Sequence, residues 1–435
     1  MFHLPRLRSL ARQRLAALVG AVLLGLAAVA FARAAEVVQS GFSGLVAAHP
    51  LAPLVFTPAI FALAASLTGR FVPEAAGSGI PQVIVASHAP RTRAGGPLVS
   101  LRTAAAKFVG TLVMLGSGAA VGREGPTVQI SAGIMVAVHR WLRVPVTAGV
   151  MIAGGAAGVA AAFNTPVAGV AFAIEELASA FEQKVAGLVM LAVVAAGLVS
   201  LGLDGDYVYF GRMTGHLPLP EAIAGALAAG LCGGVAGGLF SRALVGLIVP
   251  RPDGLIDRLK RRPVLFALGG GMIVAAAGVG TGGLTWGTGY AATRVLLGGG
   301  DVSDWFFPAR VLATLVSGAC GAPGGIFAPS LAVGAGLGRM LAEPFHDGGG
   351  TIVMLGMIGY FAGVVRAPLT AVIIVMEMTA NRAMILPLFA TALVADQVSA
   401  WVQPEKLYHA LARGVRVTPT PGRSETASAA QPAPA

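Results

Sequence analysis

The chain contains many apolar segments, and several of them are shorter than a membrane span. They lie at 15–33, 51–70, 101–119, 146–162, 166–180, 185–203, 220–248, 264–282, 308–320, 329–343, 351–364, 367–380 and 384–402. A helix needs about 20 residues to cross a hydrocarbon core of about 30 Å. The shorter segments must therefore end inside the protein, which a membrane tolerates only where the helix ends are buried or line a polar cavity.

The composition places the chain in a membrane. Of its 435 residues, 56% are hydrophobic and only 11% are charged, and the mean hydropathy is +0.79. A soluble domain cannot bury so much apolar surface. The apolar segments are longer than the strands of a membrane barrel, which run to about 10 residues, and they do not alternate with polar residues. We expect an all-α integral membrane protein built of many tilted, partly broken helices.

The net charge of +11 is better explained by membrane orientation than by binding of nucleic acid, because the basic residues are scattered over loops and ends. Four arginines precede the first apolar segment: Arg6, Arg8, Arg12 and Arg14. The positive-inside rule then places the N-terminus in the cytoplasm. Residues 1–35 also resemble a signal peptide, but an arginine at 33, inside the candidate cleavage region, favours a retained first helix.

Two similar turns interrupt the apolar sequence, and they indicate an internal duplication. Residues 122–127 (Gly-Arg-Glu-Gly-Pro-Thr) and 325–330 (Gly-Ile-Phe-Ala-Pro-Ser) share a Gly-x-x-small-Pro-hydroxyl pattern. Their prolines are separated by 329 − 126 = 203 residues, and Glu175 and Glu377 by 377 − 175 = 202 residues. Such symmetry is typical of transporters that are built from two inverted-topology repeats and bind their substrate where the repeats meet.

The duplication gives a domain organisation. We expect a cytoplasmic basic N-terminus at 1–14, a first transmembrane repeat at 15–203, an inter-repeat loop at 204–219, a second transmembrane repeat at 220–412 and a disordered tail at 413–435. The tail is expected to be disordered because it is rich in Pro, Ser, Ala and Thr.

The two turns are suited to an anion. Glycine lets backbone amides approach a ligand, and proline favours the start of a helix. A helix start inside a membrane presents unpaired N–H groups and the positive end of the helix dipole. Neutral donors of this kind can replace the hydration of an anion without holding it too tightly to leave.

The order of four motifs resembles that of the CLC family of chloride channels and chloride/proton exchangers. The motifs are Gly-Ser-Gly-Ile-Pro at 77–81, Gly-Arg-Glu-Gly-Pro at 122–126, Gly-Ile-Phe-Ala-Pro at 325–329 and the late Tyr408. The resemblance runs from about residue 15 to residue 412. It implies a homodimer with one pore per subunit and no cofactor, with chloride and protons as the transported ions. The compact chain indicates a bacterial inner membrane.

The resemblance implies the residues that bind chloride. Ser78, Tyr408 and the backbone amides of Ile326 and Phe327 match the central chloride site of the family, and the amides of Arg123, Glu124 and Gly125 match the outer part of the pathway. Two ordinary explanations remain open from the residues alone. Ser78 also suits a helix N-cap, and Tyr408 also suits the aromatic belt at a membrane interface.

Two glutamates are the candidate gating and proton-transfer residues. By resemblance, Glu124 is the gating glutamate, which fills an anion position when ionised and leaves it when protonated. Its alternative is an ion pair with Arg123, although adjacent helical residues do not face each other. Glu176 matches the internal proton-transfer residue of the exchangers, and its alternative is a surface acidic pair with Glu175. Glu176 favours exchange over a passive channel, which remains the alternative function.

The resemblance also bears on selectivity. Ser78 stands where a proline accompanies nitrate preference in related proteins, so we expect chloride and other halides. Tyr408 and the unmodified turn at 77–81 argue against the fluoride-exporting branch. Gln82 and Ile84 depart from relatives that carry acidic residues there. Lys107 resembles a family lysine that raises the local potential for anions, and a snorkelling lysine is its alternative.

An intramembrane enzyme is the remote alternative. It would use Glu124, Glu175 or His139 as catalytic groups, but the sequence contains no nucleophile-base motif and no nucleotide-binding loop. The histidines show no metal-ligand spacing. We therefore expect no catalytic residues and no metal site.

Overall fold

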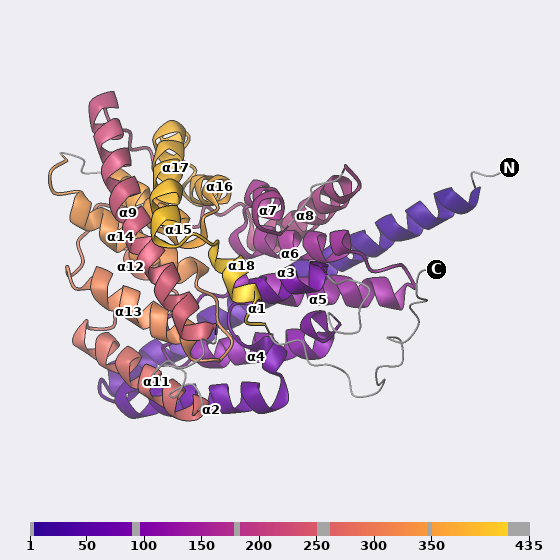
Figure 1. Ribbon diagram of the computed structural model, residues 1–435, viewed down its shortest axis with the longest axis horizontal. Coiled ribbons are helices and arrows are strands. Elements are labelled where there is room, and N and C mark those ends of the chain that lie inside the picture. Colours follow the sequence, from indigo (N-terminus) through magenta and orange to yellow (C-terminus); the bar gives the residue numbers. More distant parts are fainter. Residues whose placement is uncertain (1–3, 89–95, 178–182, 250–261, 346–349, 416–435) are drawn as a thin grey trace, which may run out of the picture.

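The computed structural model describes residues 4–88, 96–177, 183–249, 262–345 and 350–415, and within these ranges the chain is helical apart from turns and two isolated backbone bridges (Figure 1). The predicted all-α membrane fold is confirmed. The tail beyond residue 415 lies outside the described residues.

The helices of the first half are α1 (Leu4–Ala48), α2 (Pro53–Phe71), η1 (Pro73–Ala75), α3 (Ile80–His88), η2 (Pro97–Val99), α4 (Leu101–Leu115), α5 (Glu124–Trp141), α6 (Ala148–Phe163), α7 (Pro166–Phe172), a π-helical turn (Ala173–Leu177) and α8 (Gln183–Asp204). Those of the second half are α9 (Leu219–Ile248), α11 (Pro263–Gly280), α12 (Tyr290–Leu297), α13 (Phe306–Ala319), α14 (Phe327–Leu341), α15 (Thr351–Val365), α16 (Pro368–Thr379), α17 (Ile385–Val402) and α18 (Leu407–Ala412).

The helices differ in length, as the apolar segments predicted. In the described part of the chain, six helices are long and apolar enough to span a membrane: α1, α2, α8, α9, α11 and α17. The apolar helices α6, α13, α15 and α16 are shorter. Every residue of α15 is buried, so this short helix lies entirely among other helices. The long helices instead expose many leucine and valine side chains, as a lipid-facing surface requires.

The first helix is longer than its apolar segment at 15–33. α1 continues from Leu4 to Ala48 because no proline follows its first turn and because its charged residues find partners. Arg33 forms an ion pair with Asp204, with 2.7 Å between Nη2 and Oδ1. Hydropathy also missed α3, α5, α12 and α18, because each of these helices begins in a polar or glycine-rich turn.

The packing of the second half repeats that of the first. α5 packs on α6 as α14 packs on α15, and α1 packs on α8 as α9 packs on α17. Both α6 and α15 end at a residue in the left-handed conformation, Asn164 with φ 56° and Arg366 with φ 62°. In Figure 1, helices of the first half gather on one side and α9 and α12 to α17 on the other, while α2 and α11 lie side by side below.

The two repeats meet on a pseudo-two-fold axis at the paired turns. Gly122 and Gly325 exchange both backbone hydrogen bonds, with N···O distances of 2.7 and 2.9 Å. These residues occupy the same place in their turns, and a residue that pairs with its own counterpart in an antiparallel bridge lies on the symmetry axis.

The same symmetry joins α7 and α16. The Glu175 carboxylate accepts hydrogen bonds from the amides of Leu369 and Thr370 at the start of α16, at 3.1 and 2.8 Å. The Glu377 carboxylate accepts from Val167 and Ala168 at the start of α7, at 3.2 and 2.8 Å. Each carboxylate lies near the end of one helix and caps the start of the other, so the two helices are antiparallel. The repeats are therefore inverted.

Candidate functional site

Two helices begin at the junction of the repeats. The first backbone hydrogen bond of α5 runs from Thr127 N to Arg123 O, and that of α14 runs from Ser330 N to Ile326 O; both are 2.9 Å long. The earlier amides, including those of Gly125 and Phe327, have no acceptor within their own helices. Both helices thus point unpaired N–H groups toward the bridge between Gly122 and Gly325, as the motifs predict.

The serine turn is joined to the same junction. Gly77 N donates to Ala322 O, and Gly324 N donates to Gly77 O, both at 3.1 Å. A methyl group added at Gly125 would collide with Oγ of Ser78, so this hydroxyl lies directly against the start of α5. The glycines that flank Ser78, with φ of 66° and 103°, adopt backbone conformations that other residues rarely accept.

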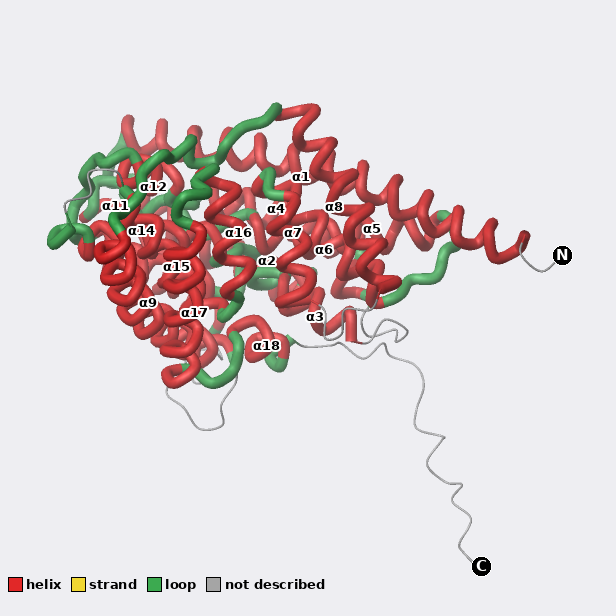
Figure 2. The backbone as a smooth tube through the Cα atoms, turned by 90° about the horizontal axis from the view of Figure 1, so that it is seen from above, coloured by secondary structure: helices red, strands yellow, loops and turns green. Residues whose placement is uncertain are grey.

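Tyr408 reaches the serine from α18, which packs against α3 (Figure 2). Its side chain is fully buried, and its hydroxyl lies close to that of Ser78. Neither hydroxyl has a hydrogen-bond partner of normal geometry among the described residues, and Ser78 therefore does not cap α3. Buried hydroxyls without partners are rare, and such a pair has the donors that an anion needs.

The Phe327 side chain is held in an aromatic cluster beside this point. Its ring lies 4.4 Å from that of Phe361 and 5.6 Å from that of Phe163, measured between centroids. Ile326 and Phe327 are both buried. Packing on the aromatic side fixes the first turn of α14 and hence the direction of its free amides.

Glu124 is fully buried at the start of α5. Tyr290 Oη donates a hydrogen bond of 2.5 Å to Oε1 of Glu124, and Oε2 has no partner within the described ranges. A methyl group at Gly122 would collide with Oε2, and the amide of Ala328 lies near the carboxylate. The carboxylate is thus folded back between the starts of α5 and α14, where free amides converge.

Arg123 is buried but does not neutralise Glu124 by direct contact. Its Nη2 donates to Oη of Tyr209 at 3.0 Å, and its Nη1 lies 3.9 Å from Oε1 of Glu36. The described part of the structure therefore contains no direct ion pair between Arg123 and Glu124. Both residues contribute amides to the same turn.

The two adjacent glutamates after α7 have different surroundings. The π-helical turn at Ala173–Leu177 directs Glu176 inward, where it is 2% exposed, and Lys406 Nζ lies 3.3 Å from its Oε1. Glu175 caps α16 instead. The alternative of a surface acidic pair is wrong, because one carboxylate is buried against a lysine and the other completes a helix start.

Comparison with known proteins decides the family. The profile of the voltage-gated chloride channel family matches residues 60–400. The chain belongs to the CLC family. Among its relatives is the H(+)/Cl(-) exchange transporter ClcA of Yersinia pseudotuberculosis serotype IB (strain PB1/+), which is 34% identical over 91% of this chain and 86% of the relative. ClcA of Klebsiella pneumoniae subsp. pneumoniae is also 34% identical, over 97% of this chain and 91% of the relative.

Solved structures agree with this assignment. A slow cyanobacterial Cl-/H+ antiporter has a TM-score of 0.79 and 28% identity, and the match covers 92% of this chain and 97% of the other. A CLC-type fluoride/proton antiporter has a TM-score of 0.77 at 22% identity, over 92% of this chain and 98% of the other, and this match supports the fold alone.

Gln82 and Ile84, which stand where acidic residues were expected, lie directly after the turn that carries Ser78. Gln82 Nε2 donates to Ala76 O at 2.6 Å, and Ile84 is buried. Lys107 is fully buried and donates to Gly77 O at 2.8 Å and to Ala76 O at 3.3 Å. Since its head is buried and bonded to carbonyls, Lys107 does not snorkel to the surface.

The residues named for an enzyme have other contacts in this CLC fold. His139 Nδ1 lies 2.9 Å from Met135 O in its own helix, and Glu175 caps α16. In the ranges that the structure describes, no group of three His, Cys, Asp or Glu side chains could hold a metal ion.

Sequence reasoning missed Tyr209 and Tyr290, which contact Arg123 and Glu124. Of the five tyrosines in the chain, Tyr207 and Tyr209 lie in the connection between the repeats and Tyr290 begins α12. The rings of Tyr209 and Tyr290 are 4.5 Å apart. The only available signal was the scarcity of tyrosine, because the contacts join residues far apart in the sequence.

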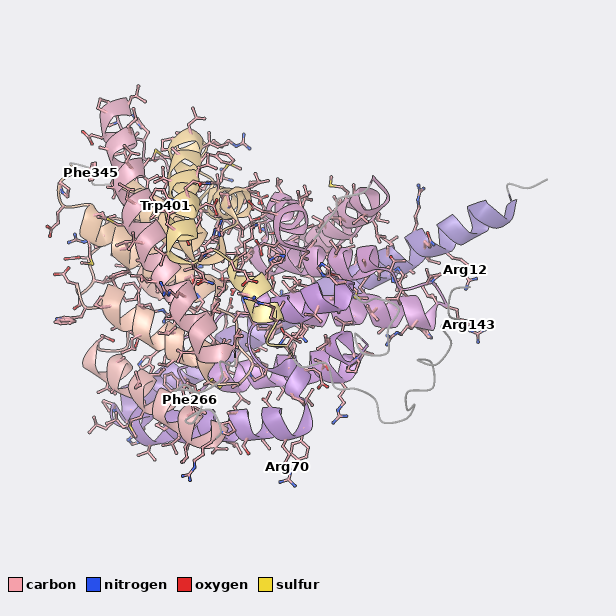
Figure 3. The ribbon with its side chains drawn as sticks, viewed as in Figure 1. Arg12, Arg70, Arg143, Phe266, Phe345 and Trp401 are labelled. Carbon is pink, nitrogen blue, oxygen red and sulfur yellow. The ribbon has the colours of Figure 1, made fainter. Side chains whose placement is uncertain are left out.

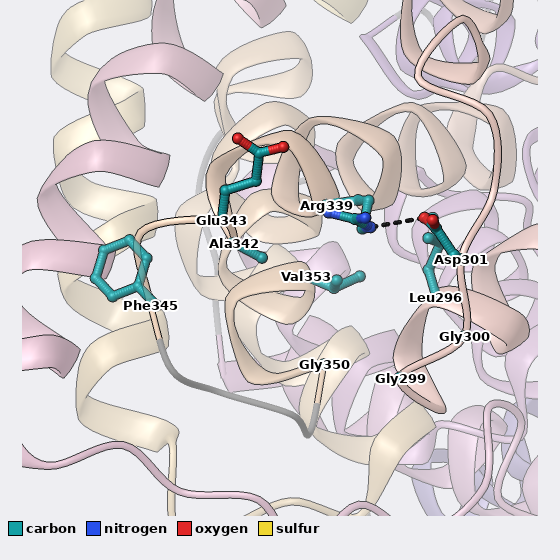
Figure 4. Close-up of a pocket in the computed structure, with 10 residues that line it drawn as sticks. All are labelled: Leu296, Gly299, Gly300, Asp301, Arg339, Ala342, Glu343, Phe345, Gly350 and Val353. Atoms are coloured by element: carbon teal, nitrogen blue, oxygen red, sulfur yellow. Dashed lines mark hydrogen bonds and ion pairs between the residues drawn. The ribbon is translucent and has the colours of Figure 1, made fainter.

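A cavity of about 310 Å³ lies away from these residues, between α12, α14 and α15 (Figure 4). It is lined in part by Asp301 and Arg339, which form an ion pair of 2.9 Å, and by Glu343 and Phe345. The hydrogen bond from Arg339 lowers the pKa of Asp301 from its ordinary value. The cavity contains none of the predicted site residues.

Proposed function

We propose that this chain exchanges chloride for protons across a membrane. The observation that carries the proposal is the pair of buried hydroxyls of Ser78 and Tyr408, which is unpartnered among the described residues and lies against the start of α5 beside Glu124. Two residues before Tyr408, Lys406 pairs with Glu176. The neutral donors at Ser78, Tyr408, Ile326 and Phe327, which we call the cradle, are thus accompanied by two buried carboxylic acids, Glu124 and Glu176. The exchange activity named for the ClcA relatives supports the same conclusion.

The cradle would bind a chloride ion through uncharged groups. The hydroxyls of Ser78 and Tyr408 have free hydrogen-bonding capacity, and the amides of Ile326 and Phe327 lie at the start of α14. These donors replace water around the ion, and the helix dipole adds a favourable field. No full positive charge among them would trap the ion.

Glu124 would act as the gate. Its ionised carboxylate lies against the amides that would otherwise bind a second anion, beside Gly125 and Ala328. Protonation removes the negative charge that these amides favour, so the side chain leaves and an anion takes its place. Competition between carboxylate and chloride for one set of donors then links anion movement to proton binding.

Glu176 would pass protons between the cytoplasm and this gate. A buried carboxylate is stable in its ionised form only when it is paired, and Lys406 supplies that charge at 3.3 Å. The presence of this second acid favours exchange over the alternative, a passive voltage- or pH-gated chloride channel. Ser78 favours chloride and other halides over nitrate.

The orientation follows from charge. Arg12 and Arg143 lie at the same end of the molecule (Figure 3), where Arg12 Nη2 also donates to Leu142 O at 2.7 Å. By the positive-inside rule this end, with the N-terminus, faces the cytoplasm, and Glu124 at the other end of α5 faces outward. We place the protein in a bacterial inner membrane as a homodimer with one pore per subunit.

Paired flux measurements test the proposal. Purified protein in liposomes is given an outward chloride gradient, and chloride and proton movements are recorded together. We expect protons to move against the chloride flow and to be driven uphill. Chloride movement without coupled proton movement would replace the exchanger with a channel.

Two variants assign the roles of the acids. Glu176→Gln should abolish proton movement and retain chloride flow, and Glu124→Ala should make chloride flow independent of pH. Normal proton pumping by Glu176→Gln, or an unchanged pH dependence in Glu124→Ala, would remove the role assigned to that residue.

A further inference from the structure

The serine turn has an unrecognised counterpart in the second repeat. Residues 77–80 are Gly-Ser-Gly-Ile and residues 287–290 are Gly-Thr-Gly-Tyr, and each tetrapeptide leads into a short helix, α3 or α12. All four glycines have positive φ: 66° and 103° in the first turn, and 61° and 86° in the second. The two turns therefore have the same backbone design.

Each of these turns is held by a buried cation. Lys107 in α4 and Arg310 in α13 are separated by 310 − 107 = 203 residues, which is also the separation of Pro126 and Pro329. Lys107 donates to Gly77 O at 2.8 Å. Arg310 Nη2 donates to Gly287 O and its Nη1 to Thr285 O, both at 2.6 Å. Both cations are fully buried.

The turns at 77–80 and 287–290, each bonded to a buried cation, present different groups to the candidate anion pathway. The first presents the Ser78 hydroxyl to the start of α5. The second places Tyr290 as the first residue of α12, and its hydroxyl reaches Oε1 of Glu124 at 2.5 Å. A phenol has one proton to donate, and a carboxylate is the stronger acceptor when it is ionised. This bond therefore stabilises Glu124 in its charged, folded-back form.

The other groups around Glu124 support the same state. Arg123 and Tyr209 form a hydrogen bond of 3.0 Å, and the Tyr209 hydroxyl lies close to that of Tyr290. Arg294 from α12 fixes the Tyr209 carbonyl at 2.8 Å. The remaining ionisable groups that face this region from packed elements are Tyr408 on α18, Tyr207 in the connection between the repeats and Glu36 on α1.

We propose that Tyr290 is an outer latch, a positioning residue that holds the gating carboxylate in the anion pathway, and that Arg310 sets the position of this latch. The proposal rests on the gating role assigned to Glu124. It means that the pH at which the gate opens is set by a second-repeat tyrosine as well as by the turn that carries the glutamate.

The test replaces Tyr290 by Phe, which removes one oxygen and keeps the ring packed on Tyr209. Without the donor, the ionised form of Glu124 is less favoured, so the midpoint of the pH–transport curve should move up by about one unit. Chloride binding to the detergent-solubilised protein above that midpoint, measured by calorimetry, should tighten by up to about tenfold, because a weaker competitor occupies the amides.

Tyr207→Phe is the matched control. Tyr207 carries the same hydroxyl and packs on Tyr209, with 5.9 Å between ring centroids, but among the described contacts it makes no hydrogen bond to Glu124. It should leave both the pH midpoint and chloride binding unchanged. If Tyr290→Phe gives a wild-type pH midpoint and wild-type chloride affinity, the latch is disproved.

Further variants separate this result from a failure of the gate. Glu124→Gln should remove the pH dependence in the presence and in the absence of Tyr290→Phe. If Glu124→Gln keeps the pH dependence, the gating role fails. Should Tyr290→Phe not fold, Arg310→Lys loosens the turn while retaining the charge. A shift of its pH midpoint in the same direction supports the latch, and an unshifted midpoint contradicts it.

Discussion

Lys406 pairs with Glu176 at 3.3 Å, and two residues later along the chain Tyr408 contributes its hydroxyl to the candidate anion cradle. The Lys406 ammonium also approaches Glu175 O at 3.4 Å. The start of α18 is therefore bonded to the candidate proton site two residues before Tyr408, the candidate anion-binding tyrosine.

Lys406→Met should weaken proton coupling. The variant leaves Glu176 buried without its counter-charge, which favours the neutral acid and impedes proton release in each cycle. Proton flux in liposomes should fall several-fold more than chloride flux. Lys406→Arg, which restores the charge, should recover much of the proton flux. An unaltered ratio of chloride to protons in Lys406→Met would show that the pair is unnecessary for coupling.

Tyr408→Phe should weaken chloride binding. The loss of one hydrogen bond to a charged group is worth about 2 kcal/mol, which corresponds to roughly 30-fold in affinity. Calorimetric titration with chloride measures it, and Ser78→Ala should have a similar effect. Tyr360→Phe is the control, because the Tyr360 hydroxyl is also buried without a partner in the described region, whereas its ring packs against Phe240 and Phe307. Equal losses in Tyr360→Phe would mean that the effect is not local to the cradle.

Glu377→Ala should reduce stability while leaving the anion residues in place. The variant removes the cap of α7, and loss of an N-cap typically costs about 1 kcal/mol. The thermal unfolding midpoint in detergent should fall by about one degree. Glu343→Ala, at an exposed glutamate beside the cavity of Figure 4, should leave it unchanged. A midpoint equal to that of the wild type would mean that other groups complete the start of α7.

Asp301→Asn should lower stability slightly at neutral pH and leave it unchanged at strongly acidic pH. Arg339 lowers the pKa of Asp301 in the folded protein, so this pair contributes stability above the ordinary pKa of an aspartate, about 3.9, and the contribution is lost as the pH falls through the lowered value. The pair is exposed and screened by salt, so the unfolding midpoint of the variant should lie only slightly below that of the wild type near neutral pH, and the two midpoints should coincide at a pH below the lowered pKa of Asp301. A clear difference at neutral pH would assign the pair a larger role.

Much of the fold could be predicted because its determinants are local. The turns around Pro126 and Pro329 carry their own helix starts, and the apolar segments mark most of the other helices. The prediction failed for the length of α1, because the partner of Arg33 is Asp204, far along the chain. Hydropathy does not register such pairs.

The positions of Ser78 and Glu124 at helix starts could be predicted because each residue lies within a short Gly-Pro motif. The contacts of Tyr290 with Glu124 and of Tyr209 with Arg123 could not be predicted, because they form only after the two repeats have packed together. Arg310 does leave a signal in the sequence, because it is an arginine within an apolar segment and its spacing from Lys107 equals that of Pro126 and Pro329.

The exchanged caps of α7 and α16 have a consequence for the origin of the chain. Neither repeat can complete this helix start with its own glutamate, since Glu175 serves the second repeat and Glu377 the first. Two identical, unlinked ancestral copies lying antiparallel would make the same pair of bonds. Gene fusion would then have made permanent a mutual dependence that already existed between separate molecules.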